Sequence, residues 1–272
     1  MSGPVVVKIG GAGVEEPREG AALWRALAEA HRLLGGQLLL VHGGGRAVDR
    51  HLERLGHRTE RIDGLRVTPP EQAAEIAAVL AGRINKALVA ALLAEGIRAV
   101  GLCLSDGGAL RCTRHPNSAL GQVGIVAGGD GGLLRTLLAA GYLPVMSSVA
   151  LDEAGGFLNV NADDAAAGVA AVLSARSLIL LSDVDGIRGP GDGGVPIGTI
   201  DAAGIEFLIT SGVISGGMIP KARAAATAAA RAAAPAYIAS FMRPADVLRI
   251  VRGEPAGTRV LPPGEQPLPT RA

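Results

Sequence analysis

Three lysines stand apart in a chain whose basic residues are almost all arginine. The 272 residues include 26 lysines and arginines, of which Lys8, Lys86 and Lys221 are lysine and 23 are arginine. Lys8 ends the apolar run VVVKI directly before Gly10 and Gly11, and Lys221 closes the segment GGMIPK. A compact ammonium reaches a single oxygen in a crowded site where a planar guanidinium does not fit. Glycine-flanked lysines therefore predict a site for a phosphate-bearing anion.

The glycine runs KIGG and HGGG strengthen this prediction, because each lies where an apolar strand passes into a loop or helix. Main-chain amides without a Cβ in the way can approach an anion there. Each motif alone is equally consistent with a tight turn, and together with Lys8 they favour an anion site. The pattern RGPGDGG satisfies GxGxxG only formally, since it runs toward Pro196 instead of a helix. No GxxxxGK[ST] loop occurs, so a Walker-type phosphate loop is excluded.

Acidic residues accompany the second lysine. Asp163 and Asp164 of VNADDA fall in the first turn of an alanine-rich helix, where the helix dipole alone would explain a carboxylate. Lys221 at the start of another alanine helix has the ordinary alternative of a surface lysine. The repeated coincidence of lysine with a glycine pair favours a functional pair.

Apolar runs and helical patterns alternate along the chain. Strands are expected near residues 5–9, 38–42, 97–105, 142–151, 177–187, 236–240 and 257–261, with helices between them. The segment 60–67 predicts a hairpin, and Thr68, Pro69 and Glu71 predict the N-cap and first turn of a helix to about Glu95. Such alternation predicts an α/β fold, a three-layer αβα sandwich with a mostly parallel central sheet and ligands at the carboxyl ends of its strands. A boundary near 176 would divide an N-terminal lobe (1–176) from a C-terminal lobe (177–272), with a disordered tail after 262.

Composition excludes several classes of function. A net charge of +1 and six aromatic residues give neither the field nor the stacking surface that nucleic-acid binding needs. No signal peptide and no run of eighteen apolar residues is visible, so a cytoplasmic protein without a membrane span is expected. Cys103 and Cys112 lack CxxC spacing and are interpreted as packed, reduced thiols.

The motifs KIGGAG, VHGGGRAVD, DGLRVTPPE, GYLPVMSSV, NVNADDAA, LILLSDVDGI, GGMIPK and GTRVL, in this order, resemble those of the acetylglutamate kinases of the amino acid kinase family. The resemblance covers nearly the whole chain. It implies ATP with Mg²⁺, bound mainly through the nucleotide phosphates, as donor, and N-acetyl-L-glutamate as acceptor in arginine biosynthesis. It also implies a homodimer whose contact and acceptor site belong to the N-terminal lobe.

The resemblance implies roles for individual residues. Lys8 and Lys221 would contact the transferring phosphoryl group, and Asp163 would hold both lysines. Acceptor binding would fall to Gly44, Gly45, Arg66 and Asn159, with Arg66 on the α-carboxylate. ATP would be bound by Gly10, Gly11, Ser182, Asp183, Val184, Asp185, Gly186, Ile214 and Ser215, and no residue is expected to be a dedicated metal ligand.

The chemistry agrees with these roles. A carboxylate acceptor with an ordinary pKa of about 4.3 is already ionised near neutral pH, so no general base is required. The obstacle is repulsion between anions, and the remedy is fixed cations and amides around the migrating phosphoryl group.

Two departures from the family pattern affect finer expectations. The chain reaches Lys8 almost at once, without the additional N-terminal helix of arginine-inhibited members, so strong arginine feedback is not expected. In the loop from Ser215 to Met218 some relatives have an acidic residue that this sequence does not have, so no metal or ribose contact is assigned to that loop. Lys86, in GRINKAL, is interpreted as a lysine on a helix surface or at an interface.

Three alternatives remain. A sister kinase would act on carrier-protein-bound aminoadipate or glutamate; the GLRVT segment disfavours it. A non-catalytic amino-acid sensor on the same fold would not need both lysines. A Rossmann-type dehydrogenase would bind a nicotinamide cofactor.

Overall fold

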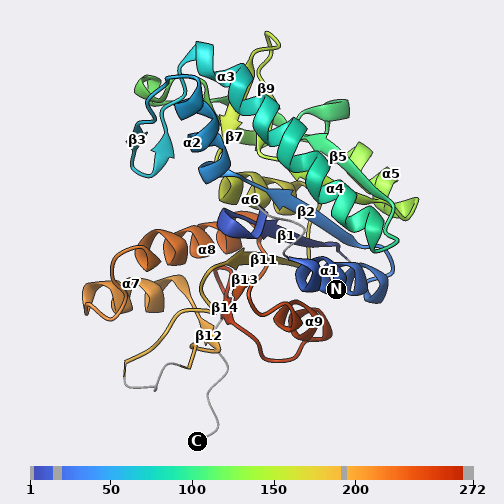
Figure 1. Cartoon of the computed structure of the whole chain (residues 1–272). Coiled ribbons are helices and arrows are strands. Elements are labelled where there is room, and N and C mark those ends of the chain that lie inside the picture. Colours follow the sequence, from blue (N-terminus) through green and yellow to red (C-terminus); the bar gives the residue numbers. More distant parts are fainter. Residues whose placement is uncertain (1–2, 15–19, 191–194, 266–272) are drawn as a thin grey trace, which may run out of the picture.

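An eight-stranded sheet forms the centre of the computed structural model, which describes residues 3–14, 20–190 and 195–265 (Figure 1). The strand order is β12-β14-β13-β11-β1-β2-β8-β5, and all neighbours are parallel except β13 and β14. The bounds of these strands are β1 (Val5–Ile9), β2 (Leu38–His42), β5 (Ala99–Cys103), β8 (Leu143–Ser147), β11 (Ser177–Ser182), β12 (Thr199–Ile200), β13 (Ala236–Ser240) and β14 (Thr258–Val260).

Helices cover both faces of this sheet. One face carries α1 (Ala21–Leu33), α2 (Gly45–Arg54), α3 (Pro70–Ala77), α4 (Asn85–Ala94) and α9 (Ala245–Arg252). The other carries α5 (Gly132–Ala139), α6 (Ala162–Val172), α7 (Ala202–Thr210) and α8 (Met218–Ala232). The predicted αβα sandwich with a mostly parallel sheet is confirmed.

Smaller elements lie beside the central sheet. A second sheet has the order β6-β7-β10-β9, and a two-stranded hairpin confirms the turn expected at 60–67. Their bounds are β3 (Arg61–Ile62), β4 (Leu65–Arg66), β6 (Arg111–Arg114), β7 (Val123–Gly128), β9 (Val149–Leu151) and β10 (Phe157–Val160), with short 3₁₀ turns at Gly11–Val14, Asp106–Gly108 and Ser118–Leu120.

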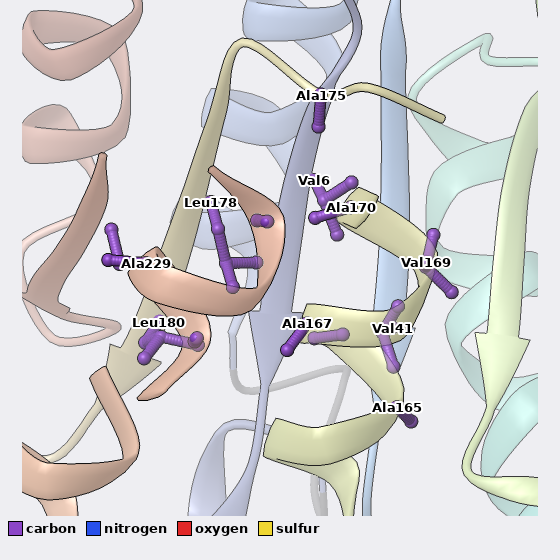
Figure 2. Close-up of a cluster of buried hydrophobic side chains, with 14 of the residues drawn as sticks. Val6, Val41, Ala165, Ala167, Val169, Ala170, Ala175, Leu178, Leu180 and Ala229 are labelled. Carbon is purple, nitrogen blue, oxygen red and sulfur yellow. The ribbon is translucent and has the colours of Figure 1, made fainter. Parts of the chain in front are cut away.

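The alternation of side chains along β1 decides where Lys8 points. Val5 and Val7 pack into the core on the α1 side, and Val6 packs into the core on the α6 side. Figure 2 shows Val6 among the alanines of α6, beside Leu178 of β11. Because successive side chains of a strand alternate between its faces, Lys8 projects to the α6 side with Val6.

The helical stretch 70–94 is continuous but not uniform. A π-helix (Ala78–Ile84) joins α3 to α4, where sequence patterning predicts one helix weakened at Gly82. The predicted N-cap at Thr68 is wrong, because the N-cap is Pro69. Thr68 lies in an extended connection, which a following proline favours, and its backbone pairs with Leu120 and Gln122.

Pro70–Ala94 is also long and apolar enough to cross a membrane by length and composition. Its residues Ile76, Leu80, Leu88 and Leu92 are buried against the central sheet and its helices, which is how a core helix packs. The segment therefore gives no reason to assign a membrane span.

The lobe boundary near 176 stays a prediction. β11 begins at Ser177, and its residues Ser177 to Leu181 pair with β1, so the central sheet crosses the proposed boundary without a break. Two expectations fall partly outside the described residues: the disordered tail, of which 266–272 are not described, and RGPGDGG, of which Gly191 and Gly194 are not described.

Candidate active site

Three neighbouring cavities lie where β1, β2 and β11 end. The glycine-loop cavity, of about 220 Å³, is lined by Gly43 to Gly45, the hairpin and β10. The central cavity, of about 330 Å³, lies between β1 and the start of α8. The outer cavity, of about 500 Å³, is lined by residues 183–186 and 213–215. Lys8 and Asp163 line the first two cavities, and Asp183 lines the last two. The cavities therefore form a row, and every predicted site residue lines at least one of them.

Lys8 is paired with a carboxylate, as a cation at a buried strand end requires. Its Nζ lies 2.9 Å from Oδ1 of Asp163, and 15% of its side chain is exposed. Asp163 is placed by the first turn of α6, whose N-cap Asn161 accepts hydrogen bonds from the amides of Asp163 and Asp164. A Cβ at Gly10 would lie only 2.8 Å from the Lys8 ammonium, so glycine there leaves the ammonium open to the cavities.

Lys221 has a different partner from the one expected. It lies in the first turn of α8, and its ammonium pairs with Oδ1 of Asp183, which also accepts a hydrogen bond from Ser182. The hydrogen bond from Lys221, with that from Ser182, lowers the pKa of Asp183 to about 2. Among the described residues the ion-pair partner of Asp163 is Lys8, so its expected role of holding both lysines stays a prediction. The half-exposed Lys221 side chain instead reaches the carboxylate at the end of β11.

Arg66 is held in a fixed orientation at the glycine-loop cavity. Its Nη1 donates to Asp49 at 2.5 Å and to Thr59 at 3.1 Å, and its Nη2 donates to the carbonyl of Gly45 at 2.9 Å. Burial disfavours the charged form of Asp49, but hydrogen bonds from Arg66 and Arg61 outweigh it and lower the pKa of that carboxyl. The Arg66 side chain is only 8% exposed, and its guanidinium keeps donors for one further partner.

Two other predicted groups line this cavity. Gly44 and Gly45 begin α2, so their amides have no carbonyl one turn earlier in the helix to bond. Asn159 of β10 donates from Nδ2 to the hydroxyl of Thr68 at 3.0 Å, which leaves its amide oxygen as an acceptor. The cavity thus offers cations and amides on one side and a carboxamide on the other.

The outer cavity is lined by the predicted Val184, Asp185, Gly186, Ile214 and Ser215. Asp185 pairs with Arg188 and Arg243, each at 3.3 Å. These two arginines, which also line the cavity, bring positive charge that sequence reasoning did not assign.

Other lining residues were missed by sequence reasoning. Arg61 and Ser148 line the glycine-loop cavity, and Arg46 lines the central cavity. Arg46 follows HGGG directly, and that position is the one signal that could have found it. Arg61 lies on β3 of the hairpin and Ser148 between β8 and β9, and no local pattern reveals that either side chain reaches the site.

The arrangement can bind a chain of anionic groups. Three helices, α2, α6 and α8, begin at the cavities, and helix N-termini favour negative charge. Among the described residues no group of three histidine, cysteine or acidic side chains could hold a metal ion.

Comparisons with known proteins agree with this geometry. Residues 3–240 match the family model described as "Amino acid kinase family". Curated acetylglutamate kinases from Vibrio cholerae and Colwellia psychrerythraea are 41% and 40% identical over 260 and 259 residues, each match covering 95% of this chain and 97% of the relative. The Yersinia pestis acetylglutamate kinase is 41% identical over 261 residues, covering 96% and 99%.

Solved structures share the fold at lower identity. The N-acetylglutamate synthase of Neisseria gonorrhoeae, complexed with coenzyme A and N-acetyl-glutamate, has a TM-score of 0.78 at 23% identity, covering 98% of this chain and 60% of its own. The carbamate kinase of Giardia lamblia, bound to AMP-PNP, has a TM-score of 0.66 at 17% identity, covering 96% and 100%. By the family model, the curated relatives and the architecture alike, this chain belongs to the amino acid kinase family.

Proposed function

We propose that this protein is an acetylglutamate kinase, which transfers the γ-phosphoryl group of ATP to the side-chain carboxylate of N-acetyl-L-glutamate in arginine biosynthesis. The observation that carries the proposal is the central cavity, on which Lys8 and Lys221 both open from different sides of the fold. About 41% identity to curated acetylglutamate kinases over nearly the whole chain supports it.

The acceptor is assigned to the glycine-loop cavity. The α-carboxylate would bind Arg66, whose guanidinium is already oriented by Asp49 and Thr59. The N–H of the acetylamino group would donate to the amide oxygen of Asn159. The side-chain carboxylate would then point toward Lys8, which lines both this cavity and the central one.

The nucleotide is assigned to the central and outer cavities. The adenosine would lie among residues 184–186 and 214–215, and the phosphates would follow Ser182, Asp183 and Gly10 toward Lys8. Mg²⁺ would be bound mainly through the phosphate oxygens, where it would neutralise charge on the triphosphate.

Catalysis in this scheme is electrostatic. The acceptor carboxylate is an anion that attacks an anionic phosphoryl group, so the transition state needs cations and amides fixed around it. Lys8, Lys221 and the amides of Gly44 and Gly45 would supply them. Loss of one such donor typically costs about 3 kcal/mol in the barrier, so a set of four is of the scale that a kinase requires.

Three finer features belong to the same proposal: the lobe boundary near 176, a cytoplasmic location, and a homodimer formed through the N-terminal lobe. β5 is the edge strand of the central sheet, and Leu93 of the adjacent α4 is 54% exposed. A second copy would cover both. Light scattering on the purified protein tests the dimer.

The experiment for the proposed activity is a coupled ADP-release assay with ATP, Mg²⁺ and free N-acetyl-L-glutamate, with L-glutamate as the control acceptor. We expect saturable turnover with the acetylated substrate only, and formation of an acyl phosphate that hydroxylamine traps. Turnover only with a carrier-protein-bound aminoadipate or glutamate would show that the protein is a sister kinase. Absence of ATP turnover with both the free and the carrier-bound acceptor would favour a non-catalytic sensor.

A further inference from the structure

The third lysine, Lys86, connects to the glycine loop through buried polar groups. It lies on the exposed side of α4, as expected for a helix-surface lysine, but its ammonium points inward. Its Nζ donates to Oδ1 of Asn85 at 3.2 Å and to the carbonyl of Gly101 on β5 at 3.3 Å. The buried Asn85 contacts Nε2 of the buried His42 at 3.0 Å, and Nδ1 of His42 contacts the carbonyl of Gly43 at 3.0 Å.

The groups at the two ends of this series of hydrogen bonds, the Lys86 ammonium and the Gly43 carbonyl, fix the direction of every hydrogen bond in it. An ammonium can only donate and a carbonyl can only accept. Lys86 therefore requires Oδ1 of Asn85 on its side, and Nδ2 of Asn85 donates both to the carbonyl of Val145 at 2.8 Å and to Nε2 of His42. His42 must then carry its proton on Nδ1 and donate it to Gly43.

His42 stays neutral in this arrangement. Burial lowers its pKa to about 4, and the nearby Lys86 charge acts in the same direction, against the hydrogen bond to Gly43. A neutral imidazole has one donor nitrogen and one acceptor nitrogen, so every hydrogen bond in this series is donated in the direction from Lys86 to Gly43.

The same helical stretch contacts the glycine loop a second time. A Cβ added at Gly44 would overlap Ile84, the last residue of the π-helix, directly before Asn85. The π-helix therefore packs against Gly44, while His42, held by Asn85, contacts the carbonyl of Gly43. The peptide between Gly43 and Gly44 is oriented by both contacts, and π-helical turns often occur where a functional site needs such placement.

We propose that Lys86, Asn85 and His42 are positioning residues that orient the Gly43–Gly44 peptide, so that the amide of Gly44 faces the transferring phosphoryl group. The proposal rests on the proposed phosphoryl transfer for its kinetic consequence only. If Lys86 no longer donated, Oδ1 of Asn85 would lose this partner, while the bonds of Nδ2 to Val145 and His42 would keep the amide orientation and the Nδ1–H tautomer. The less firmly held Asn85 side chain could then shift, and the hydrogen bond from His42 Nδ1 to the Gly43 carbonyl would weaken.

The first test is spectroscopic and independent of activity. Long-range ¹H–¹⁵N spectra of the ligand-free full chain report which ring nitrogen of each of the five histidines carries the proton, and His42→Gln assigns the signal. We expect the Nδ1–H tautomer for His42 in the natural chain and in Lys86→Arg, which keeps a donor-only side chain. In Lys86→Met we expect the same tautomer, with the Nδ1 proton of His42 exchanging with water at least tenfold faster because its hydrogen bond to Gly43 is weakened. An Nε2–H tautomer in the natural chain, or exchange of the Nδ1 proton that is as slow in Lys86→Met as in the natural chain, would overturn the proposal.

The second test is kinetic. In Lys86→Met we expect kcat to fall about tenfold with the KM of the acceptor changed less than threefold, because the Gly44 amide is displaced but not lost. Lys86→Arg should recover most of that loss. A fall in Lys86→Met that Lys86→Arg does not recover, or an unchanged kcat in Lys86→Met, would overturn the positioning role. Failure of the natural chain to turn over would contradict the proposed function and leave the spectroscopic test intact.

A glycine pair provides a matched control. A Cβ at Gly101 on β5 would overlap Asn85 Oδ1 and lie 2.6 Å from Lys86 Nζ. A Cβ at Gly82, which lies one turn before Lys86 in the helical stretch 70–94, meets nothing within 4 Å. Gly101→Ala should reproduce the faster proton exchange and the kcat loss of Lys86→Met. Gly82→Ala should leave both at the natural value, and equal effects of the two alanines would contradict the proposal.

Discussion

The two lysines of the central cavity differ in how firmly the fold holds them. Lys8 lies on β1 in the middle of the sheet, between β11 and β2, and its side chain is 15% exposed. Lys221 follows a loop in which Gly216 has a φ of +55°, and its side chain is 37% exposed. Their partners differ likewise, since the side chain of Asp163 is 31% exposed and that of Asp183 is 65% exposed.

This difference suggests a division of labour between the two ammonium groups. Lys8 cannot leave its place without disturbing the sheet, so it can act as a fixed reference for both substrates. Lys221 holds its partner through a solvent-exposed ion pair, which is weak and can be exchanged. A phosphate oxygen can therefore replace Asp183 as the partner of Lys221 at little cost, while Asp163 stays with Lys8.

The largest expected effect is that of Lys8→Arg. The longer, planar guanidinium would displace the cation from the point where the cavities meet. We expect kcat to fall about 1000-fold with the fold retained, measured by the ADP-release assay and circular dichroism. A kcat within tenfold of the natural chain would show that Lys8 does not contact the reacting group.

Lys221→Arg should have a smaller effect because the exposed start of α8 leaves room for a larger group. We expect kcat to fall about 100-fold, with a matching rise in the KM of ATP smaller than tenfold. Arg223→Lys, on the same helix but paired with Glu206 at the surface, is the control and should be neutral. If Lys221→Arg were the more damaging of the two lysine substitutions, the proposed division of labour would be reversed.

Arg66→Ala tests the acceptor side of the site. Removing the guanidinium takes one charged hydrogen-bond partner from the α-carboxylate, so the KM of N-acetyl-L-glutamate should rise about 10- to 100-fold with kcat and the KM of ATP nearly unchanged. Arg61→Ala is a useful companion, because Arg61 also pairs with Asp49 but is 45% exposed. An unchanged acceptor KM in Arg66→Ala would place the α-carboxylate elsewhere.

Local patterns in the sequence were sufficient for most of the fold and for the residue types of the site. Continuous apolar runs mark β1, β2 and β11, and the glycines after β1 and β2 mark the cavities, because both signals depend on near neighbours only. The rarity of lysine singled out Lys8 and Lys221 without any knowledge of their surroundings. The αβα sandwich followed from the order of these elements.

Contacts between distant segments could not be predicted in the same way. Asp183 and Lys221 are 38 residues apart, and only the packing of α8 beside β11 brings them together. Thr68 has the pattern of a helix cap, but its backbone is engaged by Leu120 and Gln122. His42 ends an apolar run and gives no sign of its hydrogen bonds to Asn85, 43 residues later.

A stability comparison separates the two ion pairs without any substrate. Asp163→Asn leaves the mostly buried Lys8 ammonium without its carboxylate, so we expect a loss of about 1 to 3 kcal/mol in the free energy of unfolding by urea. Asp183→Asn should cost less than about 1 kcal/mol, because solvent screens an exposed pair. Equal losses in the two variants would mean that the sheet gives Lys8 no firmer placement than the loop gives Lys221.

The smallest expected effect is the acid dependence of the exposed pair. The hydrogen bond from Lys221 lowers the folded-state pKa of Asp183 to about 2, below the ordinary value of 3.8. A carboxyl whose pKa is lower in the folded state stabilises the fold above its unfolded pKa, and this contribution is lost as pH falls through the folded pKa. The difference in unfolding free energy between the natural chain and Asp183→Asn should therefore be constant between about pH 5 and pH 8 and shrink between about pH 4 and pH 2. A difference that persists undiminished at pH 3 would mean that Lys221 stabilises the fold through contacts other than Asp183, and the easy exchange of its partner would lose its physical basis.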